Sequence, residues 1–334
     1  MKRKLCLLLL LIIAWDLSVH ACEETRAAFD IGSGTTKMKV YKYDACQKKL
    51  LSQVEEAKGN SCEADRKVSY KEDLKAASSL KRSTVEFGLK ALLELRKIAA
   101  DCGATKFSAV ATSAFRQASN GKNARSYLEE KSKIRISIID QKEEAIIGFN
   151  GAAAKSGLKT EGLCVWDIGG SSMQIVCDTK EGQKFFLGHL ASVPFKNFII
   201  ENKMTGVDLS SPNPVTDKDY SLAFERTKKE AKEIESTLGD SIKNNRVLGI
   251  GGVHYYAVSK VINLSEYSAN DISQSIKSKL NLSDKELGGG KYVDTAVSNL
   301  ILVEGIMRGL DVSKVRALKV NLTEGLVSSS QYWN

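Results

Sequence analysis

The residues best suited to chemistry lie in two short stretches of similar sequence, Phe29–Val40 and Val165–Cys177. In each stretch apolar residues lead into an aspartate, glycines with serine or threonine follow, and β-forming residues then resume. This order predicts a strand, a tight turn and a second strand. Aligned without a gap, Asp30 matches Asp167. Two copies of one hairpin in a single chain predict two similar domains that face a cleft.

Turns of this kind are suited to phosphate chemistry. Glycines let backbone N–H groups approach phosphate oxygens, hydroxyl side chains add donors, and a carboxylate at the end of a strand can hold a hydrated Mg²⁺ (or Mn²⁺) ion. Asp30 and Asp167 are therefore the candidate metal-binding residues. The candidate phosphate-binding residues of the two turns are Gly32, Ser33, Gly34, Thr35, Gly169, Gly170, Ser171 and Ser172. The structural alternative is two ordinary hairpins in which each aspartate only caps its turn.

The N-terminus has the composition of a secretory signal peptide. Three basic residues are followed by the apolar run Leu5–Trp15 and by small residues before Cys22. The apolar run is too short to span a bilayer, and no later stretch is apolar enough. We assign residues 1–21 to the signal peptide and expect an exported protein, periplasmic or extracellular. Val19–Cys22 also resembles a lipobox, in which Cys22 would carry a lipid and provide the only attachment to a membrane.

Charge and cysteine content narrow the function classes further. The formal net charge of +9 favours an anionic partner, but basic and aromatic residues do not cluster with the spacing of a nucleic-acid module, so we expect no nucleic acid. Export permits disulfides. A hairpin could bring Cys46 and Cys62 together, and Cys164 and Cys177 are equidistant from the second turn, as bridged or as merely buried thiols. The sequence has neither a C-x-x-C spacing nor a His/Cys cluster, which argues against zinc.

Hydrophobic periodicity predicts the elements that position these motifs. The first half has a long helix and two strands, and the second strand leads into another helix. The second half has a charged helix, a strand that runs into two glycines, two more helices, a strand and a final helix after Thr323-Glu324-Gly325. Hairpins followed by alternating strands and helices predict two α/β domains of the same type, each with a mixed sheet. The N-terminal domain is expected over residues 22–154 and the C-terminal domain over residues 155–334. The expected elements are Tyr70–Ala100, Phe107–Ala111, Ile134–Ile139, a helix through Ala154, Tyr220–Leu238, Arg246–Ile250, Val253–Ile262, Tyr292–Gly309 and Arg316–Val320.

Five motifs in order resemble those of the Ppx/GppA phosphatases: A-F-D-I-G-S-G-T, A-T-S-A-F-R-Q-A-S-N-G, I-I-D-Q-K-E-E-A, V-W-D-I-G-G-S-S and L-G-I-G-G-V-H. The similarity continues to N-L-T-E-G-L-V and so covers about residues 25 to 330. These are exopolyphosphatases and guanosine pentaphosphate phosphohydrolases. The resemblance implies two actin-like (ribonuclease H-like) domains with mixed five-stranded sheets and an interdomain cleft, and it suggests a homodimer.

The resemblance also implies roles for individual residues. Glu144, rather than its neighbour Glu143, would position and activate the attacking water, and Arg116 would bind a phosphoryl group. Gly251 and Gly252 resemble a third phosphate-facing loop. From the residues alone, Glu143 and Glu144 could instead be first-turn acids that the helix dipole favours, and Arg116 could form a surface ion pair.

The sequence departs from the family pattern at three places. The first turn is D-I-G-S-G-T rather than D-I-G-S-N-S. Lys37 stands where an arginine usually follows that turn, which keeps the positive charge for phosphate binding but loses the bidentate fork. Gln174 replaces the usual acidic residue, so it can orient a water molecule but cannot act as a base. A glutamine at this place is found in the related exported apyrases.

The predicted function is an exported, Mg²⁺-dependent hydrolase that releases terminal phosphate from polyphosphate or from guanosine pentaphosphate-type nucleotides. An apyrase-like nucleoside di- and triphosphate hydrolase is the alternative within enzymes. A non-catalytic protein that binds polyphosphate or nucleotides is the alternative of another class.

Overall fold

The computed structural model describes residues 22–203 and 210–333, so the predicted signal peptide at 1–21 lies outside the described residues. The chain forms two compact units: unit 1 comprises Met1–Ile138 and Leu326–Asn334, and unit 2 comprises Ile139–Gly325. This division differs from the predicted boundary at 154/155, because residues 139–154 belong to unit 2 and the last residues return to unit 1. Within the described residues, no helix combines the length and apolarity that crossing a membrane requires.

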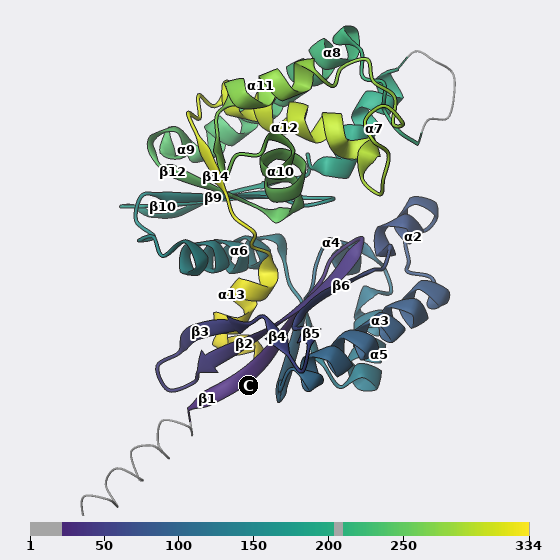
Figure 1. Ribbon diagram of the computed structural model, residues 1–334, viewed down its shortest axis with the longest axis vertical. Coiled ribbons are helices and arrows are strands. Elements are labelled where there is room, and N and C mark those ends of the chain that lie inside the picture. Colours follow the sequence, from purple (N-terminus) through teal and green to yellow (C-terminus); the bar gives the residue numbers. More distant parts are fainter. Residues whose placement is uncertain (1–21, 204–209, 334) are drawn as a thin grey trace, which may run out of the picture. The chain divides into compact units, whose positions relative to one another are not determined.

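Unit 1 is built on a mixed sheet with the strand order β3-β2-β1-β7-β8, of which β1, β2 and β3 are labelled in Figure 1. β1 and β2 form the first predicted hairpin, and β1 pairs in parallel with β7. β3 and β6 share one edge of β2, since β3 pairs with its second half and β6 with its first half. The strands are β1 (Glu23–Ile31), β2 (Thr35–Asp44), β3 (Lys49–Val54), β6 (Glu63–Lys67), β7 (Lys106–Ala111) and β8 (Arg135–Ile138), with β4 (Glu56–Ala57) and β5 (Asn60–Ser61) as a separate two-stranded ribbon.

Different segments of the chain pack on the two faces of the unit 1 sheet. Because side chains alternate along a strand, Phe29 and Ile31 of β1 pack into the core beneath the helices α2 (Tyr70–Ala76), α3 (Arg82–Asp101), α4 (Ser113–Gln117) and α5 (Gly121–Ser132). Asp30 points to the other face. The C-terminal residues lie on that face: Arg26 donates to the Val327 carbonyl at 2.9 Å, and Ser108 donates to the Tyr332 carbonyl at 2.7 Å.

Unit 2 repeats this plan with the strand order β11-β10-β9-β12-β14-β13. β9 and β10 form the second predicted hairpin, and β9 pairs in parallel with β12. The strands are β9 (Leu163–Ile168), β10 (Met173–Thr179), β11 (Gly182–Gly188), β12 (Arg246–Ile250), β13 (Glu266–Tyr267) and β14 (Val315–Ala317). Both sheets therefore have six strands among the described residues rather than the predicted five. The additional strand is a split edge position in unit 1 and the two-residue β13 in unit 2.

Helices cover both faces of the unit 2 sheet, as Figure 1 shows. Trp166 and Ile168 face a large apolar core, whereas Val165 and Val176 face a smaller one formed with α6 (Gln141–Ser156). The larger core is formed with α7 (Ser192–Asn202), α8 (Asp217–Leu238), α9 (Ser241–Asn244), the π-helix η1 (Val253–Ser259), α11 (Ala269–Lys277) and α12 (Ala296–Gly309). The remaining short elements are α10 (Lys260–Ile262), η2 (Val293–Thr295), α13 (Leu322–Ser328) and η3 (Ser330–Tyr332).

The long helix predicted over Tyr70–Ala100 is wrong in one respect, because it is broken between α2 and α3. The side chain of Asn120 donates to the Leu80 carbonyl and accepts from the Leu80 N–H, while Asp73 accepts from the Lys81 N–H. These bonds satisfy backbone groups that a continuous helix would pair internally. Their partners are distant in sequence, so periodicity could not predict the break.

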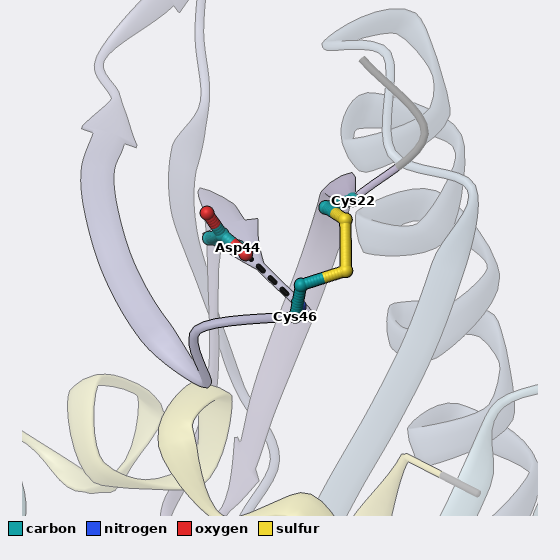
Figure 2. A group of neighbouring side chains, drawn as sticks. All are labelled: Cys22, Asp44 and Cys46. Carbon is teal, nitrogen blue, oxygen red and sulfur yellow. Dashed lines mark hydrogen bonds between the residues drawn. A yellow bond between two sulfur atoms is a disulfide. The ribbon is translucent and has the colours of Figure 1, made fainter. Parts of the chain in front are cut away.

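Three disulfides crosslink the described residues: Cys22–Cys46, Cys62–Cys102 and Cys164–Cys177. Cys164 and Cys177 are register partners on β9 and β10, which confirms them as cross-strand neighbours and decides between the two alternatives in favour of the bridge. Cys46 and Cys62 do not pair with each other. Cys22 instead joins the start of β1 to the turn after β2 (Figure 2).

Candidate active site

In unit 1 the first hairpin places Asp30 beside Lys37. The two residues are register partners on β1 and β2, and the Lys37 ammonium lies 3.4 Å from the Asp30 carboxylate. The turn between them is closed by a 3.1 Å hydrogen bond from the Gly32 N–H to the Thr35 carbonyl. A Cβ at Gly32 would stand 3.0 Å from that carbonyl, so the turn favours glycine there. The hairpin thus presents a buried carboxylate, a half-buried cation and a glycine-rich turn at one sheet end.

Arg116 belongs to the same end of the unit 1 sheet. β1 and β7 are parallel neighbours, and the Thr112 N–H donates to the Ile31 carbonyl at 3.2 Å, so α4 begins where β1 ends. Arg116 lies in the last turn of α4 and is half-buried. The predicted phosphate-binding residues of unit 1 are therefore grouped at the carboxyl ends of neighbouring strands, where α/β folds commonly bind ligands.

Lys71 joins this group, although it lies in none of the sequence motifs. Its N–H donates to the Ser33 carbonyl at 3.0 Å, and its ammonium bonds to the side chain of Gln117, next to Arg116 in α4. Burial lowers the pKa of Lys71. Its sequence context carries no motif, so only the fold could identify it.

In unit 2 the second hairpin aligns Gln174, Asp167 and Ile250 across three neighbouring strands, since Asp167 is paired with both of the others. The smaller core beneath α6 includes Val165, Val176 and Ile250. Alternation along the strands therefore directs Asp167 and Gln174 to the α6 face of the sheet. The turn is closed as in unit 1, by a 3.0 Å hydrogen bond from the Gly169 N–H to the Ser172 carbonyl.

Glu144 lies on α6, the helix that covers the face of the sheet to which Asp167 and Gln174 point. Asp140 and Glu143 form a capping box that fixes the start of the helix, and Glu144 follows in the first turn with 9% of its surface exposed. Residues four apart lie on one helical face, so Glu144 shares a face with Gly148. A Cβ at Gly148 would lie 3.7 Å from Asp167 Oδ2. The face of α6 that carries Glu144 is thus the face packed on Asp167.

Gly251 follows directly after β12 and lies close to Asp167. Its φ of +81° favours glycine, and a Cβ there would overlap the Asp167 carboxylate. Gly252 differs, because it has an ordinary helical backbone and open space around its Cα. The predicted third loop therefore contains one glycine required by close approach and one that is not.

The amide of Gln174 provides a buried donor in unit 2. Gln174 is 2% exposed, and its Nε2 atom has no hydrogen-bond partner among the described residues. A buried donor without a partner costs about 1–3 kcal/mol, so a water molecule or a ligand oxygen at this position would be strongly favoured. Gln174 thus offers a donor beside Asp167 where the family pattern has an acceptor.

Gln141 and His254 play supporting roles that sequence reasoning missed. The Gln141 side chain donates to the Gly188 carbonyl at 3.0 Å and so ties the start of α6 to β11. It lies within the I-I-D-Q-K-E-E-A motif, which could have identified it. His254, in η1, lies 2.7 Å from the Tyr267 hydroxyl. Burial lowers its pKa to about 3, so it is neutral and is no acid–base candidate.

The donor chemistry near Asp30 and Asp167 fits a hard divalent cation. Both groups offer carboxylate oxygens, the ligands that Mg²⁺ prefers, and Mg²⁺ commonly keeps several waters and uses few protein ligands. Among the described residues, the only three-residue group with metal-ligand spacing is Cys22, Asp44 and Cys46. Its two sulfurs form a disulfide, and Asp44 accepts from the Cys46 N–H at 2.9 Å (Figure 2). That group therefore holds no metal, and Mg²⁺ at either aspartate would be bound largely through water.

Comparison with known proteins identifies a family and several solved structures that this chain resembles. The model of the Ppx/GppA phosphatase family matches residues 56–331, whereas no curated protein matches the chain. A solved Ppx/GppA enzyme from Aquifex aeolicus is similar in structure, with a TM-score of 0.72, 17% identity and coverage of 92% of this chain and 99% of that chain. An exopolyphosphatase from Cytophaga hutchinsonii is similar with a TM-score of 0.72, 15% identity and coverage of 92% and 97%.

These likenesses confirm the two-domain actin-like fold, and the family match covers the hairpin motif of unit 2, Glu144 and the last loop. The interdomain cleft and the individual site roles stay predictions. On the match over residues 56–331, this chain belongs to the Ppx/GppA phosphatase family.

Proposed function

We propose that this phosphatase releases terminal phosphate from a linear phosphoanhydride chain, either polyphosphate or a guanosine pentaphosphate-type nucleotide, with Mg²⁺ (or Mn²⁺). The observation that carries the proposal is the buried carboxylate of Glu144 on the face of α6 that packs on Asp167. The similarity in structure to an exopolyphosphatase from Cytophaga hutchinsonii and the positive net charge of the chain support an anionic phosphate chain as substrate.

In the proposed mechanism Glu144 accepts a proton from the attacking water, and the buried Nε2 donor of Gln174 orients that water or a phosphoryl oxygen. Lys37 and Arg116 hold phosphate oxygens with charge-assisted hydrogen bonds. The backbone N–H groups of the two turns supply further donors. The water oxygen forms a bond to the terminal phosphorus as the P–O bond to the bridging oxygen breaks, so the shortened chain leaves with that electron pair on its oxygen and the terminal group is released as inorganic phosphate. Bound Mg²⁺ would neutralise charge on the phosphate oxygens, and the residues that would hold it are Asp30 and Asp167.

An apyrase-like activity on nucleoside di- and triphosphates is the second candidate. Gln174 favours it, because the neutral amide stands at the position where the family pattern has an acidic residue and apyrases have glutamine. Phosphate release from long-chain polyphosphate, guanosine pentaphosphate, ATP and ADP, measured side by side with Mg²⁺, separates the two. Turnover of polyphosphate or guanosine pentaphosphate supports the main proposal, whereas turnover of ATP and ADP alone supports the apyrase. An absence of phosphate release from every substrate contradicts both.

We also propose that the protein is exported and works in an oxidising compartment. The composition of residues 1–21 and the three disulfides support this proposal. The sulfur of Cys22 is bonded to Cys46, and a thioether-linked lipid would need the same atom, so the proposed mature form carries no lipid anchor. Intact mass after expression in a secreting host tests both points, since lipidation would add mass at Cys22. The homodimer stays a prediction that light scattering can test.

A further inference from the structure

Unit 1 contains a pocket of about 930 Å³ between α5, β8 and the segment that joins α4 to α5. β8 is an edge strand of its sheet, so the pocket runs along an open sheet edge. Its volume falls within the range of small-molecule sites. Arg116, the predicted phosphate-binding residue, is part of its lining. The pocket is therefore continuous with the phosphate-binding group of unit 1.

The pocket is strongly basic. Four of its lining residues are cations, namely Arg116, Lys122, Arg125 and Arg135, against one carboxylate, Glu129. Lys122 and Arg125 are three residues apart and Glu129 lies four beyond Arg125, so one face of α5 carries all three. Arg135 comes from β8 across the pocket. Lys122 and Arg135 are exposed and have no ion-pair partner within the part of the chain that the structure describes.

The single carboxylate is already engaged by the protein. Glu129 Oε2 accepts from Arg125 at 3.1 Å and from the backbone N–H of Ile136 at 2.9 Å. It thus caps the open edge of β8 and neutralises one arginine. Lys122 and Arg135 keep their charge for a ligand, and like charges gathered around one pocket favour an anion with several charges.

We infer that this pocket binds the phosphates of an inorganic polyphosphate chain beyond the one that is cleaved. The inference rests on the proposed function, because it gives the chain a substrate that extends past Arg116. Lys122 and Arg135 then act as specificity residues for long chains. A short substrate whose phosphates end at Arg116 gains nothing from them.

The lining favours polyphosphate over a single-stranded nucleic acid. Binding of nucleic acid strands combines basic grooves with aromatic side chains on which bases stack. The only aromatic side chain of the described pocket lining is Phe115, which is 2% exposed and packed in the core of unit 1. The pocket therefore offers contacts for phosphates and no stacking surface for bases.

The test is equilibrium binding of long-chain polyphosphate to the full mature chain, over a range of salt concentrations. The test variant is the double substitution Lys122→Gln/Arg135→Gln. The matched control is Arg82→Gln/Lys90→Gln, which removes two exposed cations of α3 in the same unit. We expect the test variant to bind about tenfold more weakly and its logarithmic salt dependence to fall by about two units, one for each lost phosphate contact. The control should bind as the wild type does.

Turnover of long-chain polyphosphate and of tripolyphosphate separates the pocket from the proposed function. The expected result is a higher KM for the long chain in the test variant, with an unchanged kcat and an unchanged KM for tripolyphosphate. If the test variant, the control and the wild type bind polyphosphate equally well, the pocket does not bind the chain, even if polyphosphate is hydrolysed. If binding depends on Lys122 and Arg135 but no polyphosphate is hydrolysed, the pocket is supported as a polyphosphate-binding site and the proposed function is contradicted. Equally tight binding of single-stranded DNA, lost in the same variant, overturns the assignment to polyphosphate.

Discussion

The two hairpins have the same backbone plan but opposite chemistry. Each places an aspartate opposite the residue seven positions later, closes its turn with the same type of hydrogen bond and is bridged by a disulfide at its open end. In unit 1 the aspartate faces the cation of Lys37. In unit 2 it faces the neutral amide of Gln174, and α6 adds Glu144. In the proposed function, unit 1 supplies cations for the phosphates and unit 2 supplies the residues that activate the water.

The largest expected effect is on Glu144. Replacing it with glutamine removes the proposed base and should lower kcat by about 10²–10⁴-fold. Glu143→Gln is the matched control, because glutamine can also serve in the capping box at that position. Initial rates of phosphate release from polyphosphate measure both variants. If Glu143→Gln proved the inactive one, the base would have been assigned to the wrong residue.

Loss of the Cys164–Cys177 bridge should cost stability in unit 2. A bridge over 13 residues stabilises by about 3 kcal/mol in the chain-entropy description, so the Cys164→Ala/Cys177→Ala variant should unfold at a lower denaturant concentration. Cys22→Ala/Cys46→Ala, made on the mature chain, is the counterpart in the other hairpin. An unchanged midpoint for the unit 2 variant would show that the sheet needs no crosslink at this position.

The neighbouring glycines after β12 allow a sharp test of the geometry around Asp167. Gly251→Ala would place a Cβ against that carboxylate at a positive φ, whereas Gly252→Ala has open space. We expect Gly251→Ala to lose at least about 1 kcal/mol of stability from backbone strain and most of its activity, and Gly252→Ala to retain both. Thermal unfolding and phosphate release provide the two measurements, and similar behaviour of the two variants would argue against the close approach.

Lys37→Gln makes the first hairpin resemble the second. The variant loses a proposed phosphate contact and leaves the Asp30 carboxylate, whose side chain is 8% exposed, without its cation. We expect a weakening of polyphosphate binding by about tenfold, as for the loss of one charge-assisted hydrogen bond. Lys37→Arg should bind at least as well as the wild type, because it restores the bidentate fork. Weaker binding by Lys37→Arg would mean that the site is shaped for lysine.

The last expected effect concerns acid stability in unit 2 and not activity. Burial lowers the pKa of His254 from 6.5 to about 3, so the unfolded chain binds more protons between these values. Stability from this group is fully present above about pH 6.5 and is lost as the pH falls toward 3, by at most about 1.4 kcal/mol per pH unit. His254→Gln should show a shallower fall of the free energy of unfolding between about pH 6 and about pH 4. Parallel curves for the two proteins would contradict a neutral His254.

The sequence predicted the repeated parts of the molecule best. Both hairpins, the neighbouring cysteines on β9 and β10 and the start of α6 follow from local patterns, because turns, alternation and capping act over a few residues. The break before α3, the role of Lys71 and the return of residues 326–333 to unit 1 depend on contacts between distant parts of the chain. The pairing of Cys62 with Cys102 rather than with Cys46 has the same cause. Local patterns contain no information about these contacts.

In the proposed function unit 1 holds the phosphates and unit 2 activates the water. The most direct test is to measure the Kd for polyphosphate and kcat together in Glu144→Gln and Lys37→Gln. We expect Glu144→Gln to bind the anionic chain as tightly as the wild type, or more tightly because a negative charge is lost, while its turnover falls by about 10²–10⁴-fold. We expect Lys37→Gln to bind the chain more weakly and to retain most of its turnover. Wild-type turnover in Glu144→Gln, or an unchanged Kd in Lys37→Gln, would contradict these roles of the two units.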